Sequence, residues 1–238
     1  MKCLFFIVIM LALYCKVEAQ AHLQFYFDVG KNNVSDGLFV RNACRTGYRY
    51  FRYSIEAGVQ FDLAGNSSNT FSGFELKGIS SFVLHNSPFE LKGFYMLNRV
   101  SVLLYETNWG FRMATKGRRH FSAEVGTNIK CYNLSSYAGE TLYLNSERQL
   151  KEKLHLTYSF AAYLRPLSHC LNVGFSVTNV DYFVIDQPTN PVFNLQLTCP
   201  IRAAMNLDVS VWYKQAGIFN INANYFGCFI RGGLTWII

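Results

Sequence analysis

Residues 154–177 alternate between apolar and polar side chains, and this pattern limits the folds that are open to the chain. A period of two indicates extended strand, because successive side chains of a strand point to opposite faces. Residues 166–169, Pro-Leu-Ser-His, interrupt the alternation once, so the stretch predicts an antiparallel hairpin. Strands of about 10 residues with one continuous apolar face are typical of membrane-spanning β-hairpins. The apolar positions are Leu154, Leu156, Tyr158, Phe160, Ala162, Leu164, Leu171, Val173, Phe175 and Val177.

The same alternation recurs along most of the chain, with short Gly-, Asn- or Pro-containing breaks. Half of the residues are apolar, yet no interior apolar run reaches the roughly 18 residues that a membrane helix needs. Only 16% are charged, against about 25% in an ordinary soluble domain. The sequence therefore predicts an all-β chain that forms a single antiparallel transmembrane β-barrel of about 10–12 strands. A secreted, soluble β-sandwich or lipocalin-like barrel is the alternative.

Several connections and irregular elements are predicted along the way. Residues 30–47 are polar and predict a loop, and residues 48–63 predict one long strand. Helical spacing of apolar residues predicts a short helix over 97–107, and Ser146 with Gln149 resembles a capping box at 146–152. A slip in the alternation near residues 225–227 indicates a bulge or a tight turn in the last strand.

Residues 1–20 have the pattern of a secretory signal peptide. Lys2 provides the charged start, residues 4–14 the apolar centre, and Ala19 and Ala21 the small residues before a cleavage site. Residues 21–238 are then the barrel domain, and the predicted location is the cell outer membrane. Such a barrel contacts outer-membrane lipid and lipopolysaccharide, and its insertion depends on the barrel-assembly machinery.

Charge and cysteine content narrow the function further. The net charge is +7, and removal of residues 1–20 leaves +6 without a Lys/Arg cluster of the kind that binds nucleic acid. Seven cysteines without a Cys-x-x-Cys spacing argue against a zinc site. They fit small apolar residues of the strands, and one unassigned disulfide remains an alternative. No phosphate-binding loop, metal cluster or haem motif appears, so no metal and no cofactor is expected.

Three segments carry a resemblance to a known group. Residues 229–236 (Phe-Ile-Arg-Gly-Gly-Leu-Thr-Trp), 103–110 and 119–128 resemble outer-membrane β-barrel proteins of Bacteroidetes-type bacteria. Proteins of that group end on an apolar or aromatic residue that the assembly machinery reads, and this chain departs from them in ending on Ile238 rather than on Phe or Trp. The resemblance implies the fold and the location, and it implies no catalytic residue.

The polar faces of the strands supply the candidate site residues. Mixed charges on these faces predict a polar lumen that is plugged or narrow, because buried charges must pair. The large side chains of Tyr48, Tyr50 and Trp212 are expected to narrow it further. The predicted charged lining comprises Arg52, Glu56, Asp62, Lys77, Glu124, Lys130, Arg165, Asp208, Lys214 and Arg231.

The sequence thus predicts a porin-like channel, or a structural or binding protein, without enzymatic activity; small solutes are potential ligands. The alternative is an outer-membrane lipid hydrolase, because His120 and Ser122 resemble the His-x-Ser pair of lipid A deacylases, with Glu124 as the acid. Alternate residues of a strand lie about 6.6 Å apart, which is too far for a direct hydrogen bond without side-chain reach. His155, Thr157 and Ser159 repeat the pattern, so it is not specific.

Overall fold

The computed structural model describes residues 19–32, 38–63, 71–85, 87–99, 104–115, 120–134, 150–151, 154–164, 171–179, 191–214 and 227–238. Strands account for most of them. The strands are β1 (Ala19–Asn32), β2 (Phe39–Tyr50), β3 (Tyr53–Asp62), β4 (Phe71–Leu84), β5 (Ser87–Arg99), β6 (Leu104–Thr115), β7 (Phe121–Leu134), β8 (Leu150–Lys151), β9 (His155–Leu164), β10 (Asn172–Thr178), β11 (Val192–Arg202), β12 (Met205–Lys214) and β13 (Gly227–Ile237).

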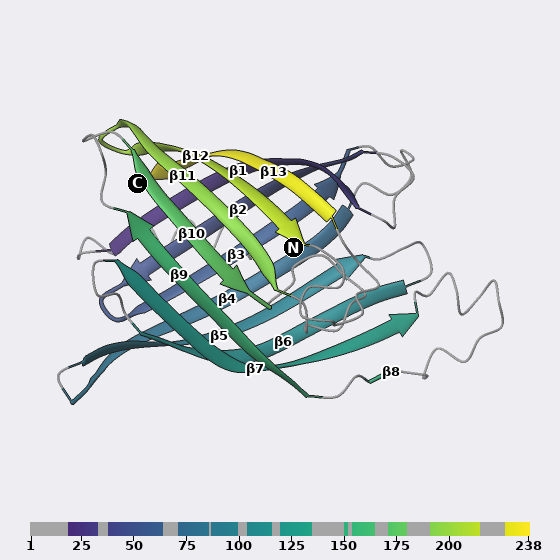
Figure 1. Ribbon diagram of the computed structural model, residues 1–238, viewed down its shortest axis with the longest axis horizontal. Helices are drawn as coiled ribbons and strands as arrows, with labels where there is room; N and C mark the ends of the chain where they lie inside the picture. Colours follow the sequence, from purple (N-terminus) through teal and green to yellow (C-terminus); the bar gives the residue numbers. More distant parts are fainter. Residues whose placement is uncertain are drawn as a thin grey trace.

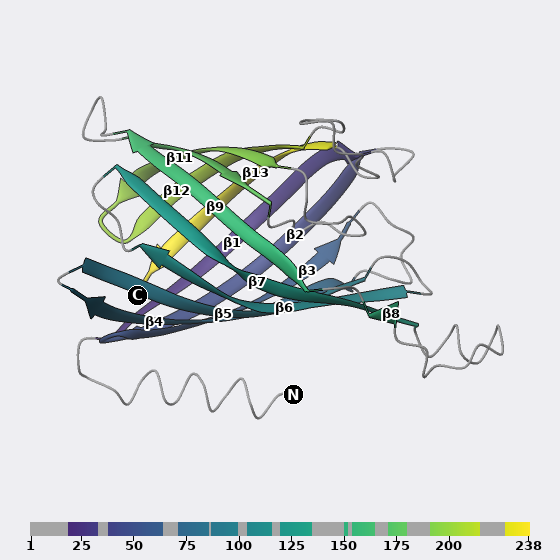
Figure 2. The same ribbon diagram turned by 60° about the horizontal axis from the view of Figure 1, so that its bottom comes forward.

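The strands form a closed antiparallel barrel of 12 strands, in agreement with the predicted fold class. Each strand of the wall pairs with its neighbours in sequence, and β1 pairs with β13 to close the circle. β8 stands outside this count, because it pairs only with Cys131 and Tyr132 of β7. The strands run obliquely around the barrel, with β9 to β13 on one side and β3 to β7 on the other (Figures 1 and 2). Among the described residues there is no helix that is long and apolar enough to cross a membrane.

The predicted central hairpin is confirmed. β9 and β10 pair in the register Val173↔Leu164 to Thr178↔Ser159. Phe160 and Phe175, on the predicted apolar face, expose 54% and 47% of their surface on the outside of the barrel. Thr157, on the opposite face, is buried. Apolar side chains thus face outward and polar ones inward, which is the reverse of a soluble barrel and the pattern of a membrane barrel.

The four described cysteines, Cys44, Cys131, Cys199 and Cys228, are free and occupy outward positions among the apolar side chains. They act there as small apolar residues. Cys3, Cys15 and Cys170 lie outside the described residues.

The predicted strand over residues 48–63 is wrong, because the chain reverses at Phe51 and Arg52. Tyr50 pairs with Tyr53 across this two-residue turn, and Phe51 has a positive φ of 51°. Neither residue is a usual turn former, so the sequence pattern does not predict this reversal. Across the turn the alternation shifts by one residue, so Tyr48 and Tyr50 face outward instead of narrowing the lumen.

Two other predictions are also wrong. Residues 39–50 form β2 and not a loop: its outward side chains include Asn42, Cys44 and Thr46, which conceal the alternation. The predicted helix over 97–107 is replaced by the end of β5 and the start of β6, since Asn98 and Glu106 pair across these strands and both lie inside the barrel. Residues 100–103 lie outside the described residues.

The structure describes only parts of the predicted helical turn, the predicted slip in the last strand and the predicted signal peptide. Leu150–Lys151 of the predicted helical turn at 146–152 are strand, and the rest of that turn lies outside the described residues. β13 keeps the predicted phase, with Ile230, Leu234 and Trp236 facing outward, whereas most of the predicted slip lies in the undescribed range 215–226. β1 begins at Ala19, two residues before the predicted domain start at residue 21. Residues 1–18 of the predicted signal peptide lie outside the described residues.

The face assignment predicts opposite effects for two neighbouring residues of β10. Phe175→Arg puts a charge on the lipid-facing surface, which costs about 2–4 kcal/mol at the middle of a bilayer. Ser176→Arg puts the same charge inside the barrel. We expect the first variant to fold poorly into lipid vesicles and the second to fold nearly as well as the wild type, as measured by the heat-sensitive gel mobility of the folded barrel. The opposite ranking would mean that the faces are inverted.

Candidate functional site

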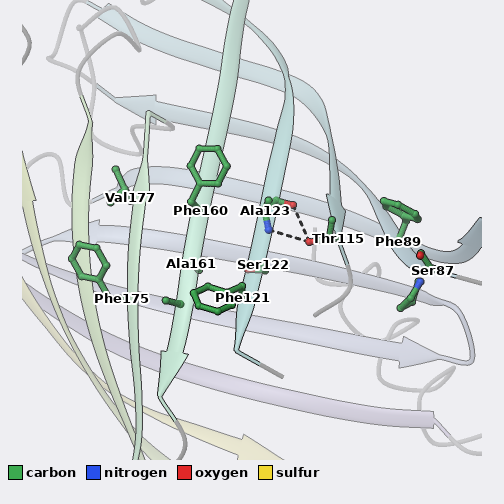
Figure 3. Close-up of a pocket in the computed structure, with 12 residues that line it drawn as sticks. Ser87, Phe89, Thr115, Phe121, Ser122, Ala123, Phe160, Ala161, Phe175 and Val177 are labelled. Carbon is green, nitrogen blue, oxygen red and sulfur yellow. Dashed lines mark hydrogen bonds between the residues drawn. The ribbon is translucent and has the colours of Figure 1, made fainter. Parts of the chain in front are cut away.

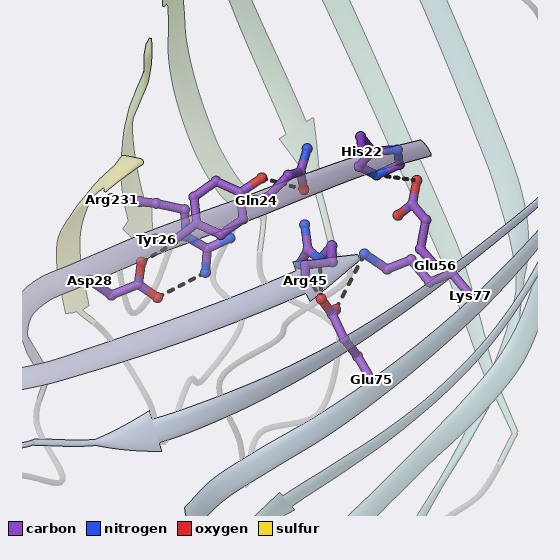
Figure 4. Close-up of polar contacts among 9 residues, drawn as sticks. All are labelled: His22, Gln24, Tyr26, Asp28, Arg45, Glu56, Glu75, Lys77 and Arg231. Carbon is purple, nitrogen blue, oxygen red and sulfur yellow. Dashed lines mark hydrogen bonds and ion pairs between the residues drawn. The ribbon is translucent and has the colours of Figure 1, made fainter. Parts of the chain in front are cut away.

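Ion pairs line the inner faces of β1 to β7 and β13, and the first of them lies at the seam that closes the barrel. Asp28 of β1 stands opposite Arg231 of β13 in the strand register. Arg231 donates from Nε to Asp28 Oδ1 at 2.7 Å and from Nη2 to Oδ2 at 2.8 Å (Figure 4). A bidentate pair of this kind fixes both side chains, so it also fixes the relative position of the first and last strands.

A second group of charges lies next to this seam. Glu75 of β4 accepts hydrogen bonds from Arg45 of β2, and its other carboxylate oxygen lies 3.3 Å from Lys77 Nζ (Figure 4). His22 Nε2 and Glu56 Oε1 lie 3.9 Å apart. Tyr26 joins the two groups, because its ring centre lies 5.4 Å from the Arg45 guanidinium carbon and 5.1 Å from that of Arg231. Gly233 makes room for Tyr26: a Cβ at Gly233 would lie 2.3 Å from the ring.

The opposite side of the wall, formed by β5 to β7, carries a further network. Glu124 of β7 contacts Lys92 and lies 3.7 Å from Arg112. Lys130 Nζ lies 3.8 Å from Glu106 Oε2, and both side chains are completely buried. Asn128 donates a hydrogen bond to Asn108 at 2.8 Å beside this pair. Solvent therefore does not reach Lys130 and Glu106, whereas Lys92 and Glu124 of the same network stay partly exposed.

A polar cavity of about 330 Å³ lies inside the barrel against the seam. Strands β1, β2, β11, β12 and β13 contribute its lining, which includes Tyr26, Arg45, Gln196, Asp208, Trp212 and Arg231. Trp212 stacks on Phe229 with ring centres 5.7 Å apart and donates from Nε1 to Ser210 at 3.0 Å. Asp208 accepts hydrogen bonds from the hydroxyls of Thr198 and Thr235 at 2.7 and 2.6 Å.

The predicted lining residues are placed as follows. Arg52 lies in the exposed turn between β2 and β3, not on the wall, because of the hidden reversal described above. Arg165 lies outside the described residues. The other eight occupy inward-facing positions of their strands: Glu56, Asp62, Lys77, Glu124, Lys130, Asp208, Lys214 and Arg231.

Sequence reasoning missed several inward residues. Arg45 falls in the predicted loop and Glu106 in the predicted helix, so neither belongs to the predicted lining. Tyr26 falls in the first predicted strand, but an aromatic side chain gives no signal that it faces a lumen. Asp28 and Glu75 alternated correctly with apolar residues, and that alternation was the signal that could have found them.

The residues of the hydrolase alternative do not come together. His120 lies in an exposed turn, and its Nδ1 is 3.3 Å from the backbone oxygen of Tyr163. Glu124 is held by Lys92 and Arg112 instead of His120. Among the described residues, no hydrogen bond or ion pair links His120 to Ser122. Ser122 does border an apolar groove of about 600 Å³, together with Phe121, Phe160 and Phe175 (Figure 3). Within the described ranges, no three His, Cys, Asp or Glu side chains cluster as a metal site would require.

Solved structures with a similar fold include outer-membrane channels and the translocator domain of the autotransporter NalP from Neisseria meningitidis, which matches with a TM-score of 0.51 and 11% identity, over 94% of this chain and 89% of that one. The NanC porin matches with a TM-score of 0.55 and 7% identity, over 89% of this chain and 98% of that one. The KdgM porin matches with a TM-score of 0.51 and 12% identity, over 90% and 98%. An outer-membrane channel from Pseudomonas putida F1 matches with a TM-score of 0.52 and 8% identity, over 92% and 95%. These similarities show that the chain has the fold of outer-membrane porins.

Comparisons at the level of sequence find no match. No protein-family model matches the chain, and no curated protein matches it.

The seam ion pair predicts a measurable coupling. Asp28→Ala leaves the Arg231 guanidinium without its carboxylate, and the loss of hydrogen bonds to a charged group costs roughly 1.5–3 kcal/mol. Arg231→Ala is expected to cost a similar amount, and the double variant little more than either single one. Urea unfolding of the four proteins in detergent measures the coupling. Additive effects of the two substitutions would contradict the seam interaction.

Proposed function

We propose that the protein is a non-enzymatic, porin-like channel of the outer membrane that admits small solutes through a narrow polar lumen. The observation that carries the proposal is the reversed barrel, with apolar side chains outside and paired charges inside. The resemblance of its last strand to Bacteroidetes-type outer-membrane proteins belongs to the same proposal. Its partners are then outer-membrane lipid and lipopolysaccharide around the wall, the assembly machinery during insertion, and small solutes in the lumen.

The outer surface supports the location. Large apolar side chains such as Phe27, Phe111 and Leu156 expose 53%, 58% and 79% of their surface, and similar residues occur all around the barrel. Apolar exposure on this scale is unfavourable in water, because monomeric soluble proteins rarely expose large contiguous apolar patches. In a membrane these side chains contact lipid instead of water, so their exposure is no longer unfavourable. A secreted soluble barrel would leave them in contact with water.

The inner surface supports a narrow passage. A barrel of this strand number lies between small barrels filled with side chains and the 16-stranded porins. Here Glu106 and Lys130 are fully buried on the wall and Trp212 projects into the lumen, so the open cross-section is smaller than the strand number alone allows. The conductance is therefore expected to be far below that of large porins.

The proposal predicts small single-channel steps in planar lipid bilayers. Purified, refolded protein should give steps well below those of a 16-stranded porin measured in the same salt. Glu106→Ala combined with Lys130→Ala removes two large buried side chains and should widen the passage, giving larger steps. Phe111→Ala, on the lipid-facing side, serves as the control and should leave the step size unchanged. Absence of any steps from protein that is demonstrably folded would refute the channel.

The groove beside Ser122 is the one observation that favours a lipid hydrolase, and it defines a separate test. Because His120 and Glu124 are engaged elsewhere, we expect no release of acyl chains from lipid A or phospholipid. The same purified sample is incubated with both lipids, and fatty acid release is quantified. Release that disappears in Ser122→Ala but persists in Ser159→Ala would replace the channel with the hydrolase.

A further inference from the structure

We infer that the cavity at the seam is a binding site for a neutral, polyhydroxylated solute, such as a mono- or disaccharide, within the channel. The inference rests on the proposed function, since it names the class of solute that the channel takes. The cavity measures about 330 Å³, which lies at the lower end of the roughly 300–1,000 Å³ that ligand sites occupy.

The charged groups that line the cavity disfavour an anionic ligand. The two cations of the cavity, Arg45 and Arg231, already contact Glu75 and Asp28 respectively. Asp208 also faces the cavity, and among the described residues its partners are the hydroxyls of Thr198 and Thr235, with no cation. An incoming carboxylate would compete with two formed ion pairs and meet the negative charge of Asp208, so the site disfavours anions.

Uncommitted amide groups favour a ligand with hydroxyls. Gln196 and Asn206 line the cavity, and within the described chain their side chains make no hydrogen bonds. Gln24 accepts a hydrogen bond from the Tyr26 hydroxyl at 2.6 Å, which leaves its amide NH₂ group available. A primary amide offers both two donors and an acceptor, so it can pair with a hydroxyl group in either direction.

The strand register arranges these groups in rows. Gln24, Thr235 and Asn206 stand opposite one another across β1, β13 and β12. Arg231, Ser210 and Gln196 form a second row across β13, β12 and β11. Neighbouring strands lie about 4.7–4.9 Å apart, so a ring-shaped solute meets several of these polar groups at once.

Aromatic side chains complete the site. Trp212 borders the cavity and is held by its stacking on Phe229 and its hydrogen bond to Ser210. Tyr26 borders it as well and is held against both guanidinium groups. Rigid aromatic surface with a few placed polar groups is the usual composition of a small-molecule site, and the carbon faces of a sugar ring supply the matching apolar surface.

Tryptophan fluorescence gives a direct test, because Trp212 is the one tryptophan of the three that faces the lumen; Trp109 and Trp236 face outward. In a Trp109→Phe/Trp236→Phe background, the emission of the folded protein in detergent reports Trp212 alone. Maltose should change this emission in a saturable way. Digalacturonate, an acidic α-1,4-linked disaccharide of similar size, should need at least about tenfold higher concentration, a difference of about 1.4 kcal/mol.

Matched amide variants locate the site. Gln196→Ala and Asn206→Ala should each weaken maltose binding at least fivefold. Gln60→Ala, which removes an amide from the inner wall outside the cavity, should leave binding unchanged. The inference is overturned by the absence of saturable binding, by tighter binding of digalacturonate, or by equal effects of all three variants. Because this assay needs no ion current, binding without conductance refutes only the channel, and conductance without binding refutes only the sugar site.

Discussion

The structure depends on one requirement, that every backbone N–H and C=O group within lipid finds a partner in the protein. Sheet closure meets it: β1 and β13 pair from His22↔Ile237 to Asn32↔Gly227, and Ala21 and Ile238 exchange hydrogen bonds beyond that ladder. Where the short strand β10 ends, Asn179 continues the ladder with its side chain. It accepts from the backbone N–H of Tyr158 at 2.6 Å and donates to the backbone oxygen of Leu156 at 2.8 Å.

Closure brings the inward charges together in a confined space, where an unpaired buried charge is unfavourable. Most of these charges pair across the wall, as Asp28 does with Arg231, and Arg231 also lines the cavity. Arginines that are occupied by wall carboxylates position Tyr26 and leave the nearby amides free. A nearly neutral polar pocket is thus a consequence of the same interactions that hold the first and last strands together.

The alternation of side chains predicted the architecture because a lipid-facing strand needs an unbroken apolar face, as residues 154–177 show. It failed where the outward face is only weakly apolar, as with Asn42 and Thr46 of β2, and where a turn lacks turn-forming residues, as at Phe51 and Arg52. The same alternation places eight of the ten predicted charges on inward-facing positions, whereas Arg52 lies in the turn between β2 and β3 and Arg165 lies outside the described residues. The cavity was beyond prediction, because it depends on the register between β1 and β13, which are joined only by closure and lie at opposite ends of the sequence.

In the described strands, the polar face points inward and the apolar face meets the lipid. Quenching by brominated lipid measures this orientation in vesicles that hold single-tryptophan variants. We expect strong quenching of a variant that retains only Trp109 and little quenching of one that retains only Trp212. Equal quenching of the two, or stronger quenching of Trp212, would contradict it.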